Sequence, residues 1–399
     1  MRYLKLFVSS LFVFSLFSLI GCSSGLQFQN IKHIHLLQDT INNIDGLDNP
    51  RVAKFNQNDS QLFVVSADDD ALAIFNVGNN VTLSLSQVFK NNEEIKGLRG
   101  ATDVAISKNG QFAYVVSFYD NALVIFKKAD DGKFHYQHTY SDKIKWWEYK
   151  GKPISSALQE FYLLGAYDIE INSSENQLYI ASSVSNAVSI FNINEDGFPI
   201  FSHAIKDTDN INFGLKGAVD VALSPDDNHL AVAGFNENVI NYFKREEDNT
   251  FRLEQSLVND SNGINNLDKP QSIVFSNNGE YLYVACASGA IVVFNQDQQG
   301  KLNYLESIKS EQITGLDGAG SVLMSHDDKL LYVVAENDNA LSIFSRNVDG
   351  TLTLKDTINN LDFNENNLLG ASSVTLSTDG QYLVVTAGKG DSLNVFEVN

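Results

Sequence analysis

Three aspartates stand at matching places in a repeating pattern of this chain: Asp103, Asp168 and Asp220. Each follows a Gly-Ala or Ala entrance and opens a short apolar segment, so we expect the three side chains at the start of three successive strands, on one arc of a common opening. Carboxylates held this close repel one another unless a cation, a basic substrate or water relieves them. The sequence therefore predicts either a Ca²⁺ site with oxygen ligands from several strands or a set of catalytic candidates for general-base chemistry. The alternative, that each aspartate caps its own loop, stays open.

A second group of candidates lies in the segment "YSDKIKWWEYKGKPISSALQEFYLL", residues 140 to 164. It contains both tryptophans of the chain, and they stand among lysines. Aromatic and basic side chains together on a loop are typical of binding anchors. The predicted binding residues are Trp146, Trp147, Lys143, Lys145 and Lys150. Because loop insertions cost little free energy, the alternative is that the tryptophans simply pack against the edge of the fold.

The elements that must position these residues follow from an internal repeat. Seven segments with the composition of β-strands end in a phenylalanine that follows an apolar or aromatic residue. These phenylalanines are Phe75, Phe126, Phe191, Phe243, Phe294, Phe344 and Phe396. A β-rich repeat of about 50 residues is typical of four-stranded propeller blades. The sequence therefore predicts an all-β fold, a β-propeller with seven blades, and the segment with the tryptophans is an insertion between the second and third blades.

The word DTINN occurs twice, at residues 39–43 and 356–360. The chain ends at what reads as the third strand of the last repeat, which would leave an unpaired strand edge. Residues 31–43 have the complementary pattern: they resemble the outer strand of a blade, but no inner strands of that blade precede them. We therefore predict that residues 31–43 form the outer strand of the seventh blade and close the ring.

Two further sets of residues recur in the blades without a chemical role. A leucine stands five residues before each inner strand position, at Leu47, Leu98, Leu163, Leu215, Leu267, Leu316 and Leu368. These leucines are predicted to be core. An Asx residue precedes most third strands, at Asp70, Asn121, Asn186, Asn238, Asn339 and Asp391. We interpret it as a turn cap rather than a ligand.

The N-terminus resembles a bacterial lipoprotein signal peptide, because Arg2 and Lys5 precede an apolar run and Leu-Ile-Gly-Cys follows it. The resemblance implies a signal peptide at 1–21, lipidation of Cys22, a linker at 22–30 and the propeller at 31–399. It places the protein in the cell envelope, with the outer membrane as the expected site and the lipid anchor as its membrane contact. The apolar run is short for the alternative, a membrane-spanning anchor. The net charge of −21 disfavours nucleic acid as a partner, and we expect a monomer.

Several segments resemble one known family. "SKNGQFAYVV", "SNNGEYLYVA", "SHDDKLLYVV" and "STDGQYLVVT" are similar to the signature of YVTN-type propellers, and "GLDGAGSV" with "NDNALSIFSR" is similar to the lactonase-like branch, which includes 6-phosphogluconolactonase and carboxymuconate cyclase. In that branch a histidine typically stands at the entrance of an inner strand. The matching positions hold no histidine: they are Val52, Asp103, Asp168, Asp220, Ser272, Ser321 and Ser373.

Three functions follow as hypotheses. The first is a non-catalytic propeller of the cell envelope that binds a protein, a glycan or a small molecule on the face with the insertion. The second is a lactone hydrolase or muconate cyclase-like enzyme, in which Asp103, Asp168 or Asp220 serves as general base or metal ligand and a lysine of the insertion holds an anionic substrate. The third is a structural lipoprotein of envelope assembly.

Overall fold

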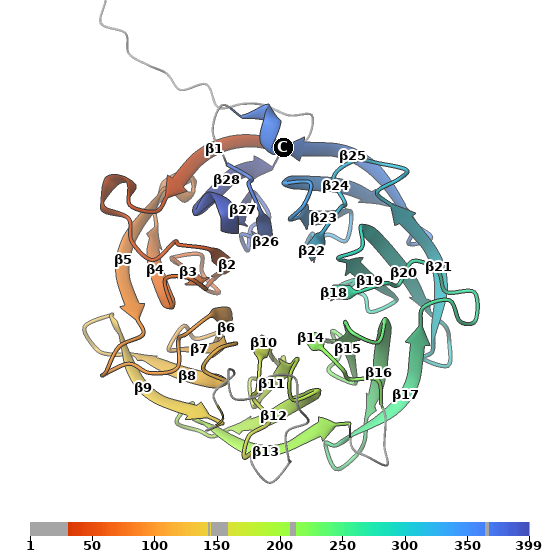
Figure 1. The fold of residues 1–399 in the computed structure, drawn as a ribbon, viewed down its shortest axis with the longest axis horizontal. Helices are drawn as coiled ribbons and strands as arrows, with labels where there is room; N and C mark the ends of the chain where they lie inside the picture. Colours follow the sequence, from red (N-terminus) through yellow and green to blue (C-terminus); the bar gives the residue numbers. More distant parts are fainter. Residues whose placement is uncertain (1–30, 143, 145–158, 208–212, 364–366, 399) are drawn as a thin grey trace, which may run out of the picture.

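The computed structural model describes residues 31–142, 144, 159–207, 213–363 and 367–398. Over these residues the chain forms seven four-stranded antiparallel sheets arranged as blades around a central channel (Figure 1). The predicted seven-bladed β-propeller is therefore confirmed.

The blades share one order of strands from the axis outward. The inner strands are β2 (Pro50–Phe55), β6 (Ala101–Ile106), β10 (Ala166–Ile171), β14 (Ala218–Leu223), β18 (Pro270–Phe275), β22 (Ala319–Met324) and β26 (Ala371–Leu376). The second strands are β3 (Gln61–Ser66), β7 (Phe112–Ser117), β11 (Gln177–Ser182), β15 (His229–Gly234), β19 (Tyr281–Cys286), β23 (Leu330–Ala335) and β27 (Tyr382–Ala387).

The third strands carry the repeated phenylalanines. They are β4 (Ala71–Val77), β8 (Ala122–Lys128), β12 (Ala187–Ile193), β16 (Val239–Arg245), β20 (Ala290–Gln296), β24 (Ala340–Arg346) and β28 (Ser392–Val398). The outer strands are β5 (Leu83–Lys90), β9 (Phe134–Ser141), β13 (Pro199–Lys206), β17 (Phe251–Val258), β21 (Leu302–Lys309), β25 (Leu352–Asn359) and, in the last blade, β1 (Ile31–Gln38).

Helical structure in the described ranges is confined to short 3₁₀ turns. They are η1 (Ile41–Asn43), η2 (Asn79–Val81), η4 (Asn360–Asp362) and η5 (Gly388–Gly390). Within the part of the chain that the structure describes, no helix has the length and apolar character needed to cross a membrane.

The hydrophobic core lies between blades rather than within them. Seven buried clusters are present, and each is shared by two neighbouring blades. The second strands are almost continuously apolar and buried, as expected for sheets covered on both faces. All seven repeated leucines are fully buried, so their assignment to the core is confirmed.

The ring closes through β1, which pairs antiparallel with β28 from Ile31 opposite Val398 to Gln38 opposite Ser392. Figure 1 shows this red strand on the outside of the blue last blade. The predicted extent of the strand, residues 31–43, was wrong: β1 ends at Gln38.

The two DTINN words are therefore not equivalent in structure. In β25 the second copy lies mostly within the strand, and Asn359 pairs with Ala340 at the position that Gln38 takes in the last blade. The first copy comes after its strand, so Ile41 is 49% exposed while Ile358 is 0% exposed. The two DTINN segments therefore do not occupy matching positions in their blades. The register of a strand is set by the side chains on its buried face and not by the sequence of the turn that follows.

The repeated Asx residues join neighbouring blades. Each has a left-handed backbone, with φ between 48° and 55°, which Asn and Asp tolerate better than other side chains. Their side-chain oxygens accept backbone N–H groups at the entrance of the following blade, for example Asp70 from Gly100 at 2.8 Å and Asp391 from Asn49 at 3.0 Å across the closure. They are turn residues, as predicted, and they also fix each blade to the next.

The closing strand contains a histidine that makes ring closure sensitive to acid. His33 lies edge-on to Phe363 and Phe396, with ring centroids 5.0 and 5.1 Å away, and its Nε2 is buried without a hydrogen-bond partner. Burial lowers the pKa of His33, so the unfolded chain binds a proton more readily than the folded protein. Stability from this group is present above the unfolded pKa of about 6.5 and is lost as pH falls from there toward the folded pKa.

We expect His33→Phe to reduce the loss of melting temperature between pH 7.5 and pH 5. The measurement is thermal unfolding of both proteins at each pH, with His135→Phe on the exposed face of β9 as the matched control. An equal acid loss in the wild type and in His33→Phe would contradict this prediction.

Candidate functional site

The central channel is the candidate site, with a cavity of about 760 Å³ lined by all seven inner strands. Each inner strand begins with a β-bulge, where its register with the second strand shifts by one residue, as between Ala101 and Asp103. Bulges turn side chains that a regular strand would point elsewhere. The bulge residues that line the channel are Arg51, Thr102, Tyr167, Val219, Gln271, Gly320 and Ser372.

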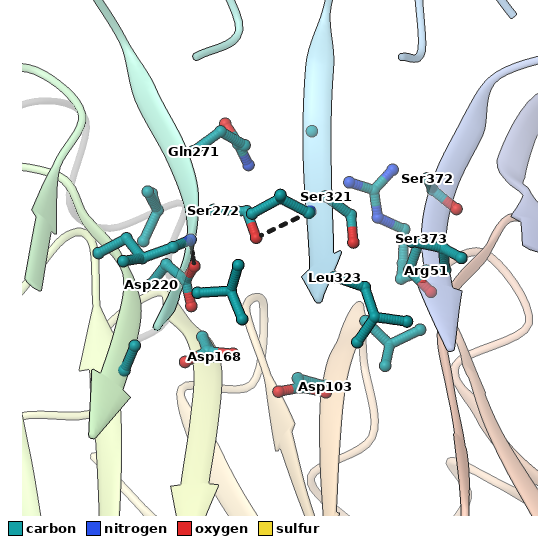
Figure 2. A pocket seen from close by; sticks show the side chains of 18 of the residues that line it. Arg51, Asp103, Asp168, Asp220, Gln271, Ser272, Ser321, Leu323, Ser372 and Ser373 are labelled. Carbon is teal, nitrogen blue, oxygen red and sulfur yellow. Dashed lines mark hydrogen bonds between the residues drawn. The ribbon is translucent and has the colours of Figure 1, made fainter. Parts of the chain in front are cut away.

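The three predicted aspartates follow these bulges and lie together on one arc of the channel. Figure 2 shows Asp103, Asp168 and Asp220 along one arc, with Ser272 beside Asp220 and Ser321 farther round the channel. Asp103 is 3% exposed, while Asp168 and Asp220 keep part of their surface open to the channel. The structure thus brings together the three candidates that the sequence singled out.

Each aspartate holds the inner strand of the next blade. Asp103 accepts the N–H of Ile169 at 3.1 Å, Asp168 that of Val221 at 3.1 Å and Asp220 that of Ile273 at 2.5 Å. The interpretation that each carboxylate caps its own loop therefore misses the main contact. Serines make the same contact more weakly in other blades, from Val322 to Ser272 at 3.3 Å and from Ala53 to Ser373 at 3.4 Å.

Lys54 supplies the positive charge beside this arc. Its Nζ lies 2.9 Å from a carboxylate oxygen of Asp103, and the Lys54 side chain is 36% exposed. Although burial opposes the charge, the carboxylates of Asp103, Asp168 and Glu170 together raise the pKa of Lys54 well above its ordinary value. The raised pKa keeps the ammonium of Lys54 charged at physiological pH.

Burial favours the protonated form of both Asp168 and Asp220. Burial raises the pKa of Asp168 well above its usual range, and the charges of Asp220 and Asp103 raise it further. Burial also raises the pKa of Asp220 to about 7, although hydrogen bonds from Ile273 and Asp168 oppose the shift. Two interacting carboxyl groups with raised pKa values can serve as an acid and a base in one site.

Glu170 lies two residues further along β10, on the same face as Asp168. Burial raises the pKa of Glu170 to about 7, and the charge of Lys54 opposes this shift. Carboxyl groups with such pKa values gather in the channel, and perturbed pKa values in a cavity are typical of functional sites.

The side chains of Arg51, Tyr167 and Gln271 form a hydrogen-bonded chain at the channel mouth. Tyr167 accepts one hydrogen bond at its hydroxyl from Gln271 at 3.0 Å and a longer one from Arg51 at 3.5 Å. Because the oxygen accepts from both, the hydroxyl hydrogen of Tyr167 remains free to be donated to a ligand. Tyr167 adjoins Asp168 in sequence, and its side chain lines the same cavity as Asp168 and Asp220.

Calcium at the three aspartates stays a prediction. Among the described residues, the carboxylates whose oxygens come within reach of one ion are Asp39, Asp45 and Asp69, outside the channel, and Lys90 is bonded to two of them. Beside Asp103 the positive charge is the ammonium of Lys54.

The predicted binding residues Trp146, Trp147, Lys143, Lys145 and Lys150 lie outside the described residues, as does the lipidation candidate Cys22. What the structure describes is how the insertion begins and ends. Asp142, 2% exposed, accepts backbone N–H groups of Phe161 at 2.9 Å and of Leu163 at 2.7 Å. This carboxylate fastens the return of the insertion to blade 2.

Sequence reasoning missed Lys54, Glu170, Arg51, Tyr167 and Gln271. Lys54 and Glu170 stand two residues after entrance positions, so the strand period of two already places them on the channel face. Arg51, Tyr167 and Gln271 face the channel because they occupy bulges, and the sequence carries no visible signal for a bulge.

Comparison with known proteins agrees with this architecture. The family model "Lactonase, 7-bladed beta-propeller" matches residues 32–146, 164–315 and 219–399. The chain belongs to this lactonase family of seven-bladed β-propellers. The resemblance noted in the repeats is thereby confirmed for the family.

The curated relatives are distant. An uncharacterized protein of Staphylococcus epidermidis is 24% identical over 212 residues, which is 49% of this chain and 58% of that protein. A Serratia proteamaculans protein named 6-phosphogluconolactonase is 28% identical over 140 residues, which is 34% of this chain and 41% of that protein. The chain thus matches little more than half the length of the staphylococcal relative.

Solved structures share the fold at low identity. A proposed 6-phosphogluconolactonase from Bacteroides uniformis has a TM-score of 0.64 at 17% identity, covering 82% of this chain and 88% of that one. Hydrazine synthase from Kuenenia stuttgartiensis has a TM-score of 0.64 at 14% identity, covering 91% and 99%. These likenesses show the fold alone, because the same frame serves unrelated chemistries.

The pairing of Lys54 with Asp103 can be tested on stability. Lys54→Met leaves the buried carboxylate without its cation and should cost about 2 kcal/mol, less than a fully buried pair because part of Lys54 is exposed. The double variant Lys54→Met/Asp103→Asn removes both charges and should recover part of that cost. Urea unfolding of the wild type, Lys54→Met, Asp103→Asn and the double variant measures it, and a double variant no more stable than the sum of the two single changes would contradict the pairing.

Proposed function

We propose that this protein hydrolyses lactones in its central channel. The observation that carries the proposal is the carboxyl pair Asp168 and Asp220, whose pKa values are raised by burial and which lines the same channel as the Tyr167 hydroxyl. Membership of the lactonase propeller family and the Serratia relative named 6-phosphogluconolactonase support the same chemistry. The lactonase hypothesis thereby gains weight over the non-catalytic binding module, which stays an alternative.

The first step needs a base and a stabilised oxyanion. Asp220, ionised above its pKa of about 7, takes a proton from water while the water oxygen bonds to the lactone carbonyl carbon. The carbonyl π electrons move to oxygen, and the hydroxyl of Tyr167 donates a hydrogen bond to that developing charge. A donor fixed in place in this way needs no reorganisation during the reaction.

The second step needs an acid. The tetrahedral intermediate collapses, the bond between the carbonyl carbon and the ring oxygen breaks, and Asp168 gives its proton to the leaving oxygen. Because Asp168 and Asp220 are hydrogen-bonded, the proton that Asp220 took can return to Asp168 and restore the starting state. The product is an open-chain hydroxy acid.

Asp103 and Lys54 act as positioning residues in this scheme. Asp103 fixes the start of β10 through Ile169 and raises the pKa of Asp168, and Lys54 balances the charge of Asp103. The family histidine is replaced here by carboxyl groups, which can serve as acid and base when their environments separate their pKa values.

The pH dependence of lactone hydrolysis tests this scheme. The rate should rise as pH increases through about 7, because Asp220 must lose its proton. It should fall again at higher pH, when Asp168 loses the proton that it must donate. Because the two carboxyl groups interact, the apparent pKa values of the rising and falling limbs describe the pair and not either residue alone. The measurement is kcat/KM for hydrolysis of simple lactones, corrected for spontaneous hydrolysis at each pH.

Substitutions of the two aspartates show which residue gives rise to each limb of the pH–rate profile. Asp220→Asn should lower kcat by about 100-fold or more and abolish the rise near pH 7. Asp131→Asn, which changes an exposed aspartate on the outer turn of blade 2, is the matched control and should keep the wild-type profile. Unchanged kcat in both Asp220→Asn and Asp168→Asn would rule out the carboxyl pair as the catalyst.

We also propose that Cys22 anchors the protein to the cell envelope, on the strength of the lipoprotein-like segment before it. Metabolic labelling with a palmitate analogue should mark the wild type and leave Cys22→Ser unmarked. Equal labelling of both proteins, or none of either, would contradict the anchor.

A further inference from the structure

The wall of the channel carries its charges unequally. The described charged residues that line it are Arg51, Lys54, Asp103, Asp168, Glu170, Asp220 and Glu336. Lys54 forms a salt bridge with Asp103, and Glu336 forms one with Lys389 at 3.2 Å. Among the described lining residues, Arg51 is therefore the one cation that has no carboxylate partner.

A phosphate group fits such a wall poorly. A phosphate monoester carries about two negative charges at neutral pH, and proteins hold it with several Lys or Arg side chains or with a helix N-terminus. The described wall offers a single uncommitted cation, Arg51, and the described helices are three-residue 3₁₀ turns. Carboxylates at Glu170 and Asp220 would repel the phosphate.

The other side of the channel is neutral and rich in hydroxyl groups. Ser272 accepts the N–H of Val322 at 3.3 Å, so its own hydroxyl hydrogen is free for a ligand. The hydroxyl of Ser321 makes no hydrogen bond to a described residue, although its backbone pairs with Val334 in the sheet, and Figure 2 shows both serines facing the cavity. Hydroxyl and amide groups around a cavity are suited to the hydroxyls of a sugar, which both donate and accept hydrogen bonds.

We propose that the channel selects an uncharged, polyhydroxylated lactone and discriminates against the same lactone carrying a phosphate. This inference rests on the proposed lactonase activity and adds the substrate class. A cavity of about 760 Å³ is large enough for a monosaccharide ring with its bound water. The reaction that supplies such a substrate is the oxidation of a free sugar at its anomeric carbon, and not that of a sugar phosphate.

The experiment compares two probes on the purified protein at pH 7.5 and low ionic strength. The probes are D-glucono-1,5-lactone and its 6-phosphate ester, and initial rates are corrected for spontaneous hydrolysis. We expect kcat/KM for the uncharged lactone to exceed that for the phosphate ester by about 100-fold, from repulsion between the phosphate and the carboxylates of the wall.

A charge variant tests the cause of this preference. Glu170→Gln removes one channel carboxylate that is outside the proposed acid and base pair, and it should reduce the preference about tenfold. Asp131→Asn removes the same charge from the outer turn and should leave the preference unchanged. The ratio of two substrates does not depend on the fraction of protein that is folded, so partial destabilisation by Glu170→Gln does not obscure the result.

The possible outcomes separate this inference from the proposed function. A phosphate ester hydrolysed as fast as the uncharged lactone, or faster, would overturn the substrate class and leave the lactonase activity standing. A preference that Glu170→Gln does not change would overturn the electrostatic cause. Absence of catalysis on both probes would overturn the proposed function and this inference with it.

Discussion

The propeller depends on side-chain oxygens that accept backbone N–H groups from the neighbouring blade. One ring of them is formed by the Asx residues before the third strands, such as Asp391, which bonds Asn49 across the closure. A second ring surrounds the axis, where residues such as Asp168 and Ser373 hold the next inner strand. Inner strands contribute N–H groups that their own sheets leave unpaired, and an unpaired buried donor is costly. Each blade therefore depends on the blade before it.

The inner ring also shows why the charges in the channel need an explanation beyond structure. Ser272 and Ser373 make the inter-blade contact with a hydroxyl and no charge. Aspartate at Asp103, Asp168 and Asp220 satisfies the same backbone groups at the added cost of burying three carboxyl groups side by side. The structure offsets that cost with Lys54 and with a retained proton, which is the arrangement that acid–base catalysis uses. Function is the simplest account of a charge that the fold does not require.

Much of this architecture is legible in the sequence because it is repeated. Seven leucines and seven phenylalanines at regular spacing gave the blade count, and all of them are fully buried. The three aspartates could be placed on one arc because they hold the same place in successive repeats. Features that break the repeat were harder to infer. The copied DTINN word suggested a strand to residue 43, while the pairing with β28 ends at Gln38.

The chemistry of the site was less predictable for a physical reason. It depends on β-bulges, at which Arg51, Tyr167 and Gln271 line the channel and contact one another. The pKa values depend on burial and on charges from blades far apart in sequence, as between Lys54 and Asp103. Lys54 and Glu170 could have been predicted, because each lies two residues after the first channel-facing position of its strand and alternate side chains of a strand face the same side.

The central claim is that one carboxyl group of the channel remains protonated at neutral pH, and infrared spectroscopy tests it most directly. A protonated carboxyl absorbs as a C=O stretch that is separate from the carboxylate bands. The difference spectrum between the wild type and Asp168→Asn at pH 7 should contain the carboxylic acid band, because burial and two neighbouring carboxyl groups hold the proton on Asp168. A difference spectrum with carboxylate bands alone would mean that Asp168 is ionised, and the account of the channel as an acid and base pair would be wrong.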